Sequence, residues 1–231
     1  MNLSLPRRTV ALGLLAGSLA LAGCGKDDSS SGSSSSGGSG SANALTQCPP
    51  ADGSAQKKQS FDDAPPMCID ANKTYTATMT TDVGDVVITL DAKKAPKTVN
   101  NFVVLSRYHF YDGVSFHRVI PGFMAQGGDP KGDGTGGPGY TIEDEFPQQG
   151  EYKEGSIAMA NTGQPNSGGS QFFIVTGDSG TALPPQYTLF GQVSKGMDVV
   201  KKIEADGNQD GSQEGTPVKK HTITSVKIEE K

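Results

Sequence analysis

Residues 116–128 of this 231-residue chain read Phe-His-Arg-Val-Ile-Pro-Gly-Phe-Met-Ala-Gln-Gly-Gly. The run places Arg118 and Gln126 among large apolar side chains. Arginine is scarce here, because Arg107 is the only other one beyond residue 8. A guanidinium is always charged, carries five donors and is rarely buried without a partner. The run therefore predicts a site lined partly by apolar groups and partly by hydrogen-bond donors.

The N-terminus has the pattern of an export signal. Arg7 and Arg8 precede residues 10–22, an apolar run without charge that is too short to span a bilayer comfortably. The run ends in Leu21-Ala22-Gly23-Cys24, which resembles the lipobox of bacterial lipoproteins, where the cysteine is acylated and becomes the mature N-terminus. An ordinary secretory peptide is the alternative, and the two arginines leave general secretory and twin-arginine export both open.

We therefore expect residues 1–23 to be a lipoprotein signal peptide and Cys24 to carry the lipid that attaches the protein to the outside of a bacterial cell membrane. Residues 24–43 are predicted to be a flexible tether, because most of them are serine and glycine. Residues 44–69 are predicted to be an irregular extension, and residues 70–231 one folded domain.

Export to an oxidising compartment would bear on how the cysteines pair. With Cys24 acylated, Cys48 and Cys68 remain as an even pair, for which we expect a disulfide. The bridge would close a loop of about 20 residues, worth about 3 kcal/mol in the chain-entropy model. Two free thiols are the alternative. A zinc site is disfavoured because there is no Cys-x-x-Cys and the three histidines lie far away in sequence.

The charge of the chain restricts its partners. The formal net charge is −5, and removing a signal peptide with Arg7 and Arg8 makes it more negative. An acidic chain without basic clusters argues against a nucleic-acid partner. Membrane contact would then come from the lipid rather than from a polybasic surface.

The folded domain reads as mainly β. Alternation in 75–80 and 85–90 predicts a hairpin, and Pro96 suits the first turn of a helix through Arg107. A second short helix is predicted around Met197, Val200 and Ile203. Short apolar runs separated by Gly, Pro and Asp follow at 115–120, 122–126, 155–160, 171–176, 187–193 and 221–228. These features favour an antiparallel barrel or sandwich.

Several ordered motifs together resemble the cyclophilin family of peptidyl-prolyl isomerases, over residues 72–231. They are Phe-His-Arg, a hydrophobic pair, Pro-Gly-Phe and Gln-Gly-Gly-Asp at 116–129, Met-Ala-Asn at 159–161, Gly-Ser-Gln-Phe-Phe at 169–173, Phe-Gly-Gln-Val at 190–193 and the helix start at 95–102. The resemblance implies a closed eight-stranded antiparallel β-barrel capped by two α-helices. It also implies a monomeric isomerase that needs no cofactor or metal and acts on proline-containing segments, here of exported proteins.

The same resemblance assigns site residues. Arg118 is the implied catalytic donor, and Gln126 orients it and binds substrate. The residues implied to bind the substrate peptide and its proline ring are His117, Phe123, Met124, Ala160, Asn161, Gln171, Phe173, Leu183 and Tyr187. We expect His117 to line the groove rather than act as acid or base, because isomerisation transfers no proton.

The chain departs from the familiar cyclophilin pattern at several places, one of them Tyr187, which stands where the pattern often has a histidine. It contains no tryptophan, and it reads Thr181-Ala182-Leu183 where the pattern has a tryptophan that helps to bind cyclosporin. Gln164 is inserted in the loop 162–169, and residues 130–141 form a divergent loop without an assigned role.

Three other enzyme or metal sites fit poorly. No Gly-Lys-Ser/Thr follows the glycines at 127–139, no Gly-x-Ser-x-Gly elbow is present, and residues 129–134 lack the acidic spacing of a calcium loop. The alternative function that stays open is a membrane-tethered chaperone that binds proline-containing segments and does not depend on turnover.

Overall fold

The computed structural model of the chain describes residues 47–231. The predicted signal peptide, the predicted lipidation site Cys24 and the predicted tether lie outside the described residues. Within the described part, no helix is long and apolar enough to cross a membrane.

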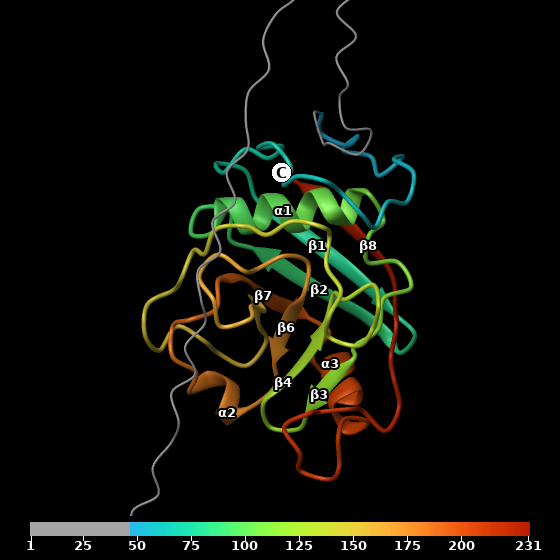
Figure 1. Cartoon of the computed structure of the whole chain (residues 1–231), viewed down its shortest axis with the longest axis vertical. Helices are drawn as coiled ribbons and strands as arrows, with labels where there is room; N and C mark the ends of the chain where they lie inside the picture. Colours follow the sequence, from blue (N-terminus) through green and yellow to red (C-terminus); the bar gives the residue numbers. More distant parts are fainter. Residues whose placement is uncertain (1–46) are drawn as a thin grey trace, which may run out of the picture. The chain divides into compact units, whose positions relative to one another are not determined.

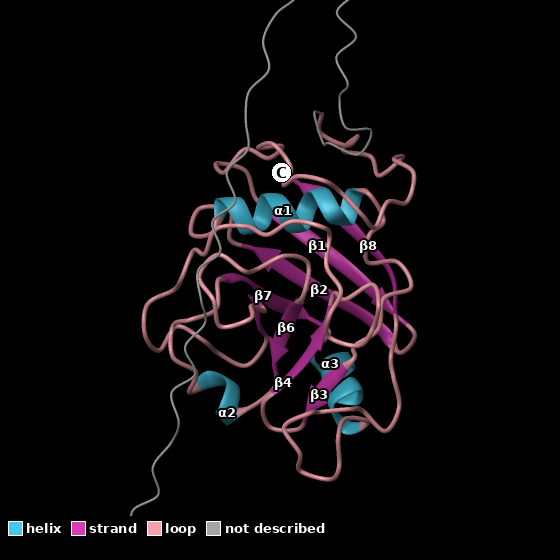
Figure 2. Ribbon diagram, viewed as in Figure 1, coloured by secondary structure: helices cyan, strands magenta, loops and turns pink. Residues whose placement is uncertain are grey.

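The domain is built on one antiparallel sheet with three helices (Figures 1 and 2). Its strands follow the spatial order β3-β4-β6-β5-β7-β2-β1-β8. The strands are β1 Tyr75–Thr81, β2 Gly84–Leu90, β3 Arg118–Ile120, β4 Met124–Gly127, β5 Ser156–Met159, β6 Phe172–Val175, β7 Leu189–Lys195 and β8 Ile223–Glu230. The helices are α1 Pro96–Arg107, α2 Asp178–Thr181 and α3 Met197–Ala205. The predicted hairpin is β1–β2, and both predicted helices are present as α1 and α3.

The prediction of a closed barrel was wrong, because the sheet is open between its end strands β3 and β8. A loop occupies the outer edge of β3: the N–H of Val119 donates to Gly215 O at 2.7 Å, and the N–H of Asn208 donates to Val119 O at 2.9 Å. These bonds satisfy the backbone groups that β8 would otherwise pair with. A single bridge, Ser115 to Thr222, joins the segments that precede the two end strands.

The expectation of only two helices was also wrong. The additional helix, α2, has four residues and so shows no apolar periodicity in the sequence.

The sheet separates two apolar clusters. Phe102 of α1 packs against Tyr111, Phe172 and Phe190 in the main core, with ring centroids 5.1, 5.9 and 5.4 Å away. Successive side chains of a strand point to opposite faces, so the neighbour of Phe172 on β6, Phe173, enters a second cluster. The second cluster lies at the candidate site.

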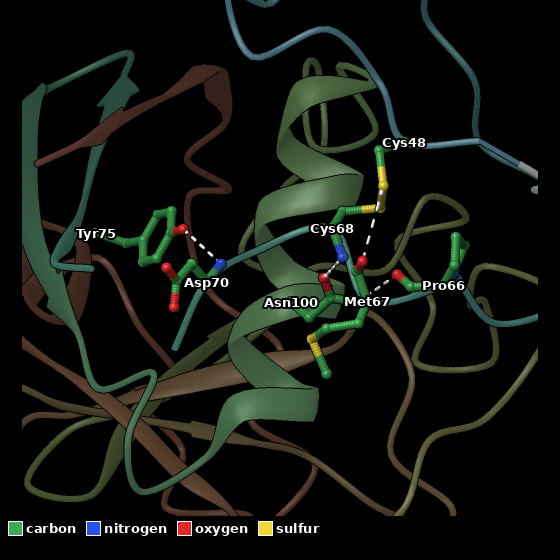
Figure 3. Close-up of a disulfide and its surroundings, with 7 residues drawn as sticks. All are labelled: Cys48, Pro66, Met67, Cys68, Asp70, Tyr75 and Asn100. Atoms are coloured by element: carbon green, nitrogen blue, oxygen red, sulfur yellow. Dashed lines mark hydrogen bonds between the residues drawn. A yellow bond between two sulfur atoms is a disulfide. The ribbon is translucent and has the colours of Figure 1, made fainter. Parts of the chain in front are cut away.

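The N-terminal extension (residues 47–69) contains no helix or strand and lies against α1 (Figure 1). The predicted disulfide between Cys48 and Cys68 is present, with a Cα–Cα distance of 5.4 Å. Figure 3 shows how Asn100 of α1 holds the same region: its Oδ1 accepts the N–H of Cys68 at 2.7 Å, and its Nδ2 donates to Pro66 O at 2.9 Å. The extension is therefore attached to α1 by side-chain bonds as well as closed on itself covalently.

Candidate active site

The hairpin β3–β4 brings the two residues assigned to catalysis side by side. Arg118 pairs with Gln126 in the strand register. The turn between the strands needs Gly122, whose φ is +74°, in the left-handed region that glycine adopts at little cost. The N–H of Gly122 donates to the Glu204 carboxylate of α3 at 2.7 Å, which fixes the turn.

The Arg118 guanidinium is held from two sides. Its Nη1 donates to Gln126 Oε1 at 3.4 Å, while its Nε and Nη2 donate to the backbone carbonyl of Gln213 at 3.2 and 2.9 Å. Burial lowers the pKa of Arg118, but a guanidinium remains protonated at neutral pH. A charged donor is therefore fixed in one orientation. Sequence reasoning missed Gln213, because the contact is made by a backbone carbonyl and leaves no side-chain signal.

A row of amides continues from Arg118. Gln126 Nε2 donates to Gln171 Oε1 at 2.9 Å. Gln171 Nε2 in turn donates to the carbonyls of Gly134 and Gly136, both at 2.9 Å. The predicted substrate-binding glutamine thus connects the arginine with the divergent loop at 130–141.

The apolar residues assigned to the proline pocket gather in the second cluster, which we call the site cluster. Met124 and Phe173 are buried in it, and Phe123, Ala160, Leu183 and Tyr187 pack against them, partly exposed. Phe173 and Tyr187 meet edge to face, with centroids 5.3 Å apart. Phe123 lies under the guanidinium carbon of Arg118 at 6.0 Å from the ring centroid. The arrangement joins a charged donor to an apolar, partly exposed wall.

His117 and Asn161 take different places. His117 is 8% exposed, and neither ring nitrogen has a hydrogen-bond partner among the described residues. Burial lowers the pKa of His117, so the ring is neutral at neutral pH. Asn161 uses its side chain locally, because Nδ2 donates to Gln186 O at 2.8 Å and Oδ1 accepts the N–H of Gly163 at 3.0 Å. Neither side chain is arranged for proton transfer.

A cavity of about 710 Å³ opens beside the amide row. Gln126, Gln171, Ala160 and Asn161 line one side of it, and the loop from Lys131 to Thr141 lines the other. The site cluster residues Phe123, Phe173 and Leu183 do not line this cavity. The predicted residues therefore divide between an apolar wall under Arg118 and a cavity next to it that is lined in part by the amides of Gln126 and Gln171.

Asp129 organises the start of the loop and was not found from the sequence. Its carboxylate accepts the N–H groups of Lys131, Asp133 and Gly134 at 2.7, 3.1 and 2.6 Å. Burial raises the pKa of Asp129, and these backbone bonds lower it by more, so its pKa lies below the ordinary value. The aspartate at the end of the Gln-Gly-Gly-Asp motif was the available signal. Among the described residues, no group of three or more His, Cys, Asp or Glu side chains is arranged to hold a metal ion.

Comparisons with known proteins agree with this geometry. The family model "Cyclophilin type peptidyl-prolyl cis-trans isomerase/CLD" matches residues 76–228. A probable peptidyl-prolyl cis-trans isomerase B of Mycobacterium tuberculosis is 41% identical over 167 residues, which cover 65% of this chain and 53% of that protein. A peptidyl-prolyl cis-trans isomerase of Helicobacter pylori is 45% identical over 135 residues, covering 57% and 82% of the two chains. The chain thus spans about half the length of the mycobacterial relative.

A solved structure gives the same result. The crystal structure of a Cryptosporidium parvum cyclophilin type peptidyl-prolyl cis-trans isomerase matches with a TM-score of 0.61 and 31% identity, covering 68% of this chain and 98% of that one. Over the residues that form the sheet, the site cluster and the Arg118 hairpin, this chain belongs to the cyclophilin type peptidyl-prolyl cis-trans isomerase family.

Proposed function

We propose that this protein accelerates the cis–trans isomerisation of X-Pro peptide bonds. The observation that carries the proposal is the Arg118 guanidinium, held by Gln126 and the Gln213 carbonyl above the apolar site cluster. The family membership and the isomerases among its relatives support it.

Catalysis of X-Pro isomerisation requires a hydrogen-bond donor beside an apolar pocket. Rotation about an X-Pro bond must overcome a barrier of about 18–20 kcal/mol, because the amide C–N bond is partly double. As the bond twists, the proline nitrogen regains its lone pair and becomes a hydrogen-bond acceptor. A donor bond of about 1.5–3 kcal/mol that exists only in this state gives roughly 10- to 150-fold acceleration. Arg118 would supply the bond, while Phe123, Phe173 and Leu183 would hold the ring.

The test is a protease-coupled assay on an Ala-Pro peptide. Arg118→Ala should lower kcat/KM about tenfold or more, because the transition-state bond is lost. Arg107→Lys is the control, since Arg107 is the only other arginine of the described chain and pairs with Glu230 of β8 at 2.8 Å instead. A wild-type protein that isomerises no faster than the uncatalysed peptide, yet suppresses aggregation, would instead favour the tethered chaperone.

The cellular context is a second part of the proposal. We infer that the protein is exported, lipidated at Cys24, and acts as a monomer on proline-containing segments of other exported proteins. The lipobox at residues 21–24 supports this, and so does the Cys48–Cys68 disulfide, a bond that persists in oxidising compartments. Mass spectrometry of the mature N-terminus should find an acylated Cys24. The Cys24→Ser variant should no longer be found in the membrane fraction. An unmodified N-terminus elsewhere would overturn this assignment without touching the isomerase activity.

A further inference from the structure

The N-terminal extension lies outside the family match at 76–228, yet it contacts the loop that lines the cavity beside Gln126 and Gln171. We propose that Phe61 of this extension is a positioning residue, which fixes the end of the glycine-rich loop (residues 130–141) and thereby the cavity beside Gln126 and Gln171. The inference rests on the proposed function, because it assigns the cavity to the peptide that the isomerase binds.

The extension is bound along its length by backbone and side-chain contacts. The N–H of Lys58 donates to Tyr108 O at 2.9 Å, and Gln59 Nε2 donates to Phe110 O at 2.7 Å. The next contact is with the loop itself, since the N–H of Phe61 donates to Pro138 O at 2.8 Å. The extension thus connects the end of α1 with the wall of the cavity.

The Phe61 side chain is a buried anchor. It is 2% exposed and packs between the rings of Tyr108 and Tyr140, with centroid distances of 5.5 and 6.2 Å. The backbones also meet closely: a Cβ added to Gly139 would lie 2.2 Å from Phe61 O. Glycine at 139 is therefore what lets the loop approach the extension.

The loop needs such an anchor because it has little conformational preference of its own. Five of its residues are glycines: Gly132, Gly134, Gly136, Gly137 and Gly139. Glycine loses more backbone freedom on ordering than any other residue. Asp129 fixes the start of the loop through three backbone N–H groups, and Phe61 fixes its end. Between these two anchors lie the carbonyls of Gly134 and Gly136 that hold Gln171.

A second connection runs from the same anchor to the far side of the cavity. Tyr140, which packs on Phe61, donates its hydroxyl to Asn101 Oδ1 at 2.6 Å. Asn101 Nδ2 then donates to Gly169 O at 2.7 Å, and both Tyr140 and Gly169 line the cavity. Removing the Phe61 ring would loosen the loop wall whose carbonyls hold Gln171.

The experiment compares two substrates that share one Ala-Pro bond. One is a short peptide that fills the ring pocket, and the other is longer and reaches the cavity. Phe61→Ala should raise KM for the longer peptide about fivefold and leave its kcat within about twofold of the wild-type value. KM and kcat for the short peptide should change little. The reason is that the variant loses substrate binding in the cavity and keeps the transition-state bond from Arg118. The side-chain amide resonances of Gln171 should shift in the same variant.

Ile69→Ala is the matched control. Ile69 is a buried apolar residue of the same extension and the same core, but it lies next to Asp70, which bonds Tyr75 of β1 rather than the loop. It should lower stability without moving either KM. Because Phe61→Ala leaves a hole in the core, Phe61→Leu provides a second measurement: it keeps most of the side-chain volume, removes the aromatic ring, and should still raise KM for the longer peptide.

The inference is overturned if Phe61→Ala leaves KM for the longer peptide unchanged, or if Ile69→Ala changes it equally. An inactive wild-type protein would refute the proposed function instead. In that case the dissociation constant of the longer peptide, measured by NMR titration, still gives the same comparison between Phe61→Ala and Ile69→Ala.

Discussion

Asp129 is buried and makes contacts that only an ionised carboxylate makes well. It is 1% exposed, and its two oxygens accept the N–H groups of three loop residues. The same bonds that lower its pKa therefore hold the loop beside Gln171. The start of the loop that lines the cavity is therefore held by this one charge.

We predict that Asp129→Asn lowers the free energy of unfolding by about 1–3 kcal/mol, because the amide replaces an oxygen acceptor with a donor that faces N–H groups. The folded pKa lies below the unfolded value of about 3.9, so the stability from ionised Asp129 is fully present above that pH and is lost as pH falls through the folded pKa. Urea unfolding at a series of pH values measures both effects. An Asp129→Asn variant that loses as much stability as the wild type when the pH falls below about 4 would contradict this.

At the scale of elements, the extension and α1 form one unit through two kinds of bond. The Cys48–Cys68 bridge closes the extension, and Asn100 bonds the backbone on either side of Met67 (Figure 3). Because the extension contains no helix or strand, its order depends on these bonds together with the contacts of Lys58, Gln59 and Phe61. Its order is needed at Phe61, where it meets the loop.

We predict that the double substitution Cys48→Ser and Cys68→Ser lowers the free energy of unfolding by about 3 kcal/mol, the loop-closure entropy of about 20 residues. Urea unfolding of the two proteins measures it. A reductant should bring the wild type to the same value and leave the double variant unchanged. An equal loss in both proteins on reduction would show that the effect has another origin.

At the scale of the whole molecule, the loop that leaves the sheet open also completes the site. Gly215 O accepts the N–H of Val119 at the edge of β3, and the nearby Gln213 carbonyl holds Arg118. A Cβ added to Gly215 would lie 2.8 Å from both Arg118 Cγ and Ile120 Cγ1. The segment between α3 and β8 therefore sets where the guanidinium lies.

We predict that Gly215→Ala lowers kcat/KM about tenfold or more, because displacing Arg118 misaligns the donor bond. Gly211→Ala is the matched control: both glycines have positive φ, +69° and +74°, but a Cβ at Gly211 meets no atom of the described residues within 4 Å. Gly211→Ala should introduce the same backbone strain but keep kcat/KM within about twofold of the wild-type value. The isomerase assay measures both variants. Equal losses of kcat/KM in Gly215→Ala and Gly211→Ala would contradict the proposal that this loop positions Arg118.

Local patterns predicted much of this molecule because they depend on neighbours in sequence. The alternation at 75–90 was enough for the β1–β2 hairpin, and Pro96 with its apolar face was enough for α1. The motif at 116–128 assigned Arg118 and Gln126 to one site by resemblance, and the structure pairs them across a short turn, in a hairpin that the sequence analysis did not predict. Four-residue α2 carries no comparable periodicity and was missed.

By itself, then, the sequence determined the family, the β1–β2 hairpin and the pairing of Cys48 with Cys68. Only the tertiary structure decided that the sheet is open, that the Gln213 carbonyl holds Arg118, and that Phe61 meets the cavity loop. The physical reason is the kind of contact involved. These three features depend on backbone carbonyls and on close approaches that glycine permits between segments distant in sequence. Every residue carries the same backbone carbonyl, so the sequence does not indicate which partner a given carbonyl will have in the folded protein.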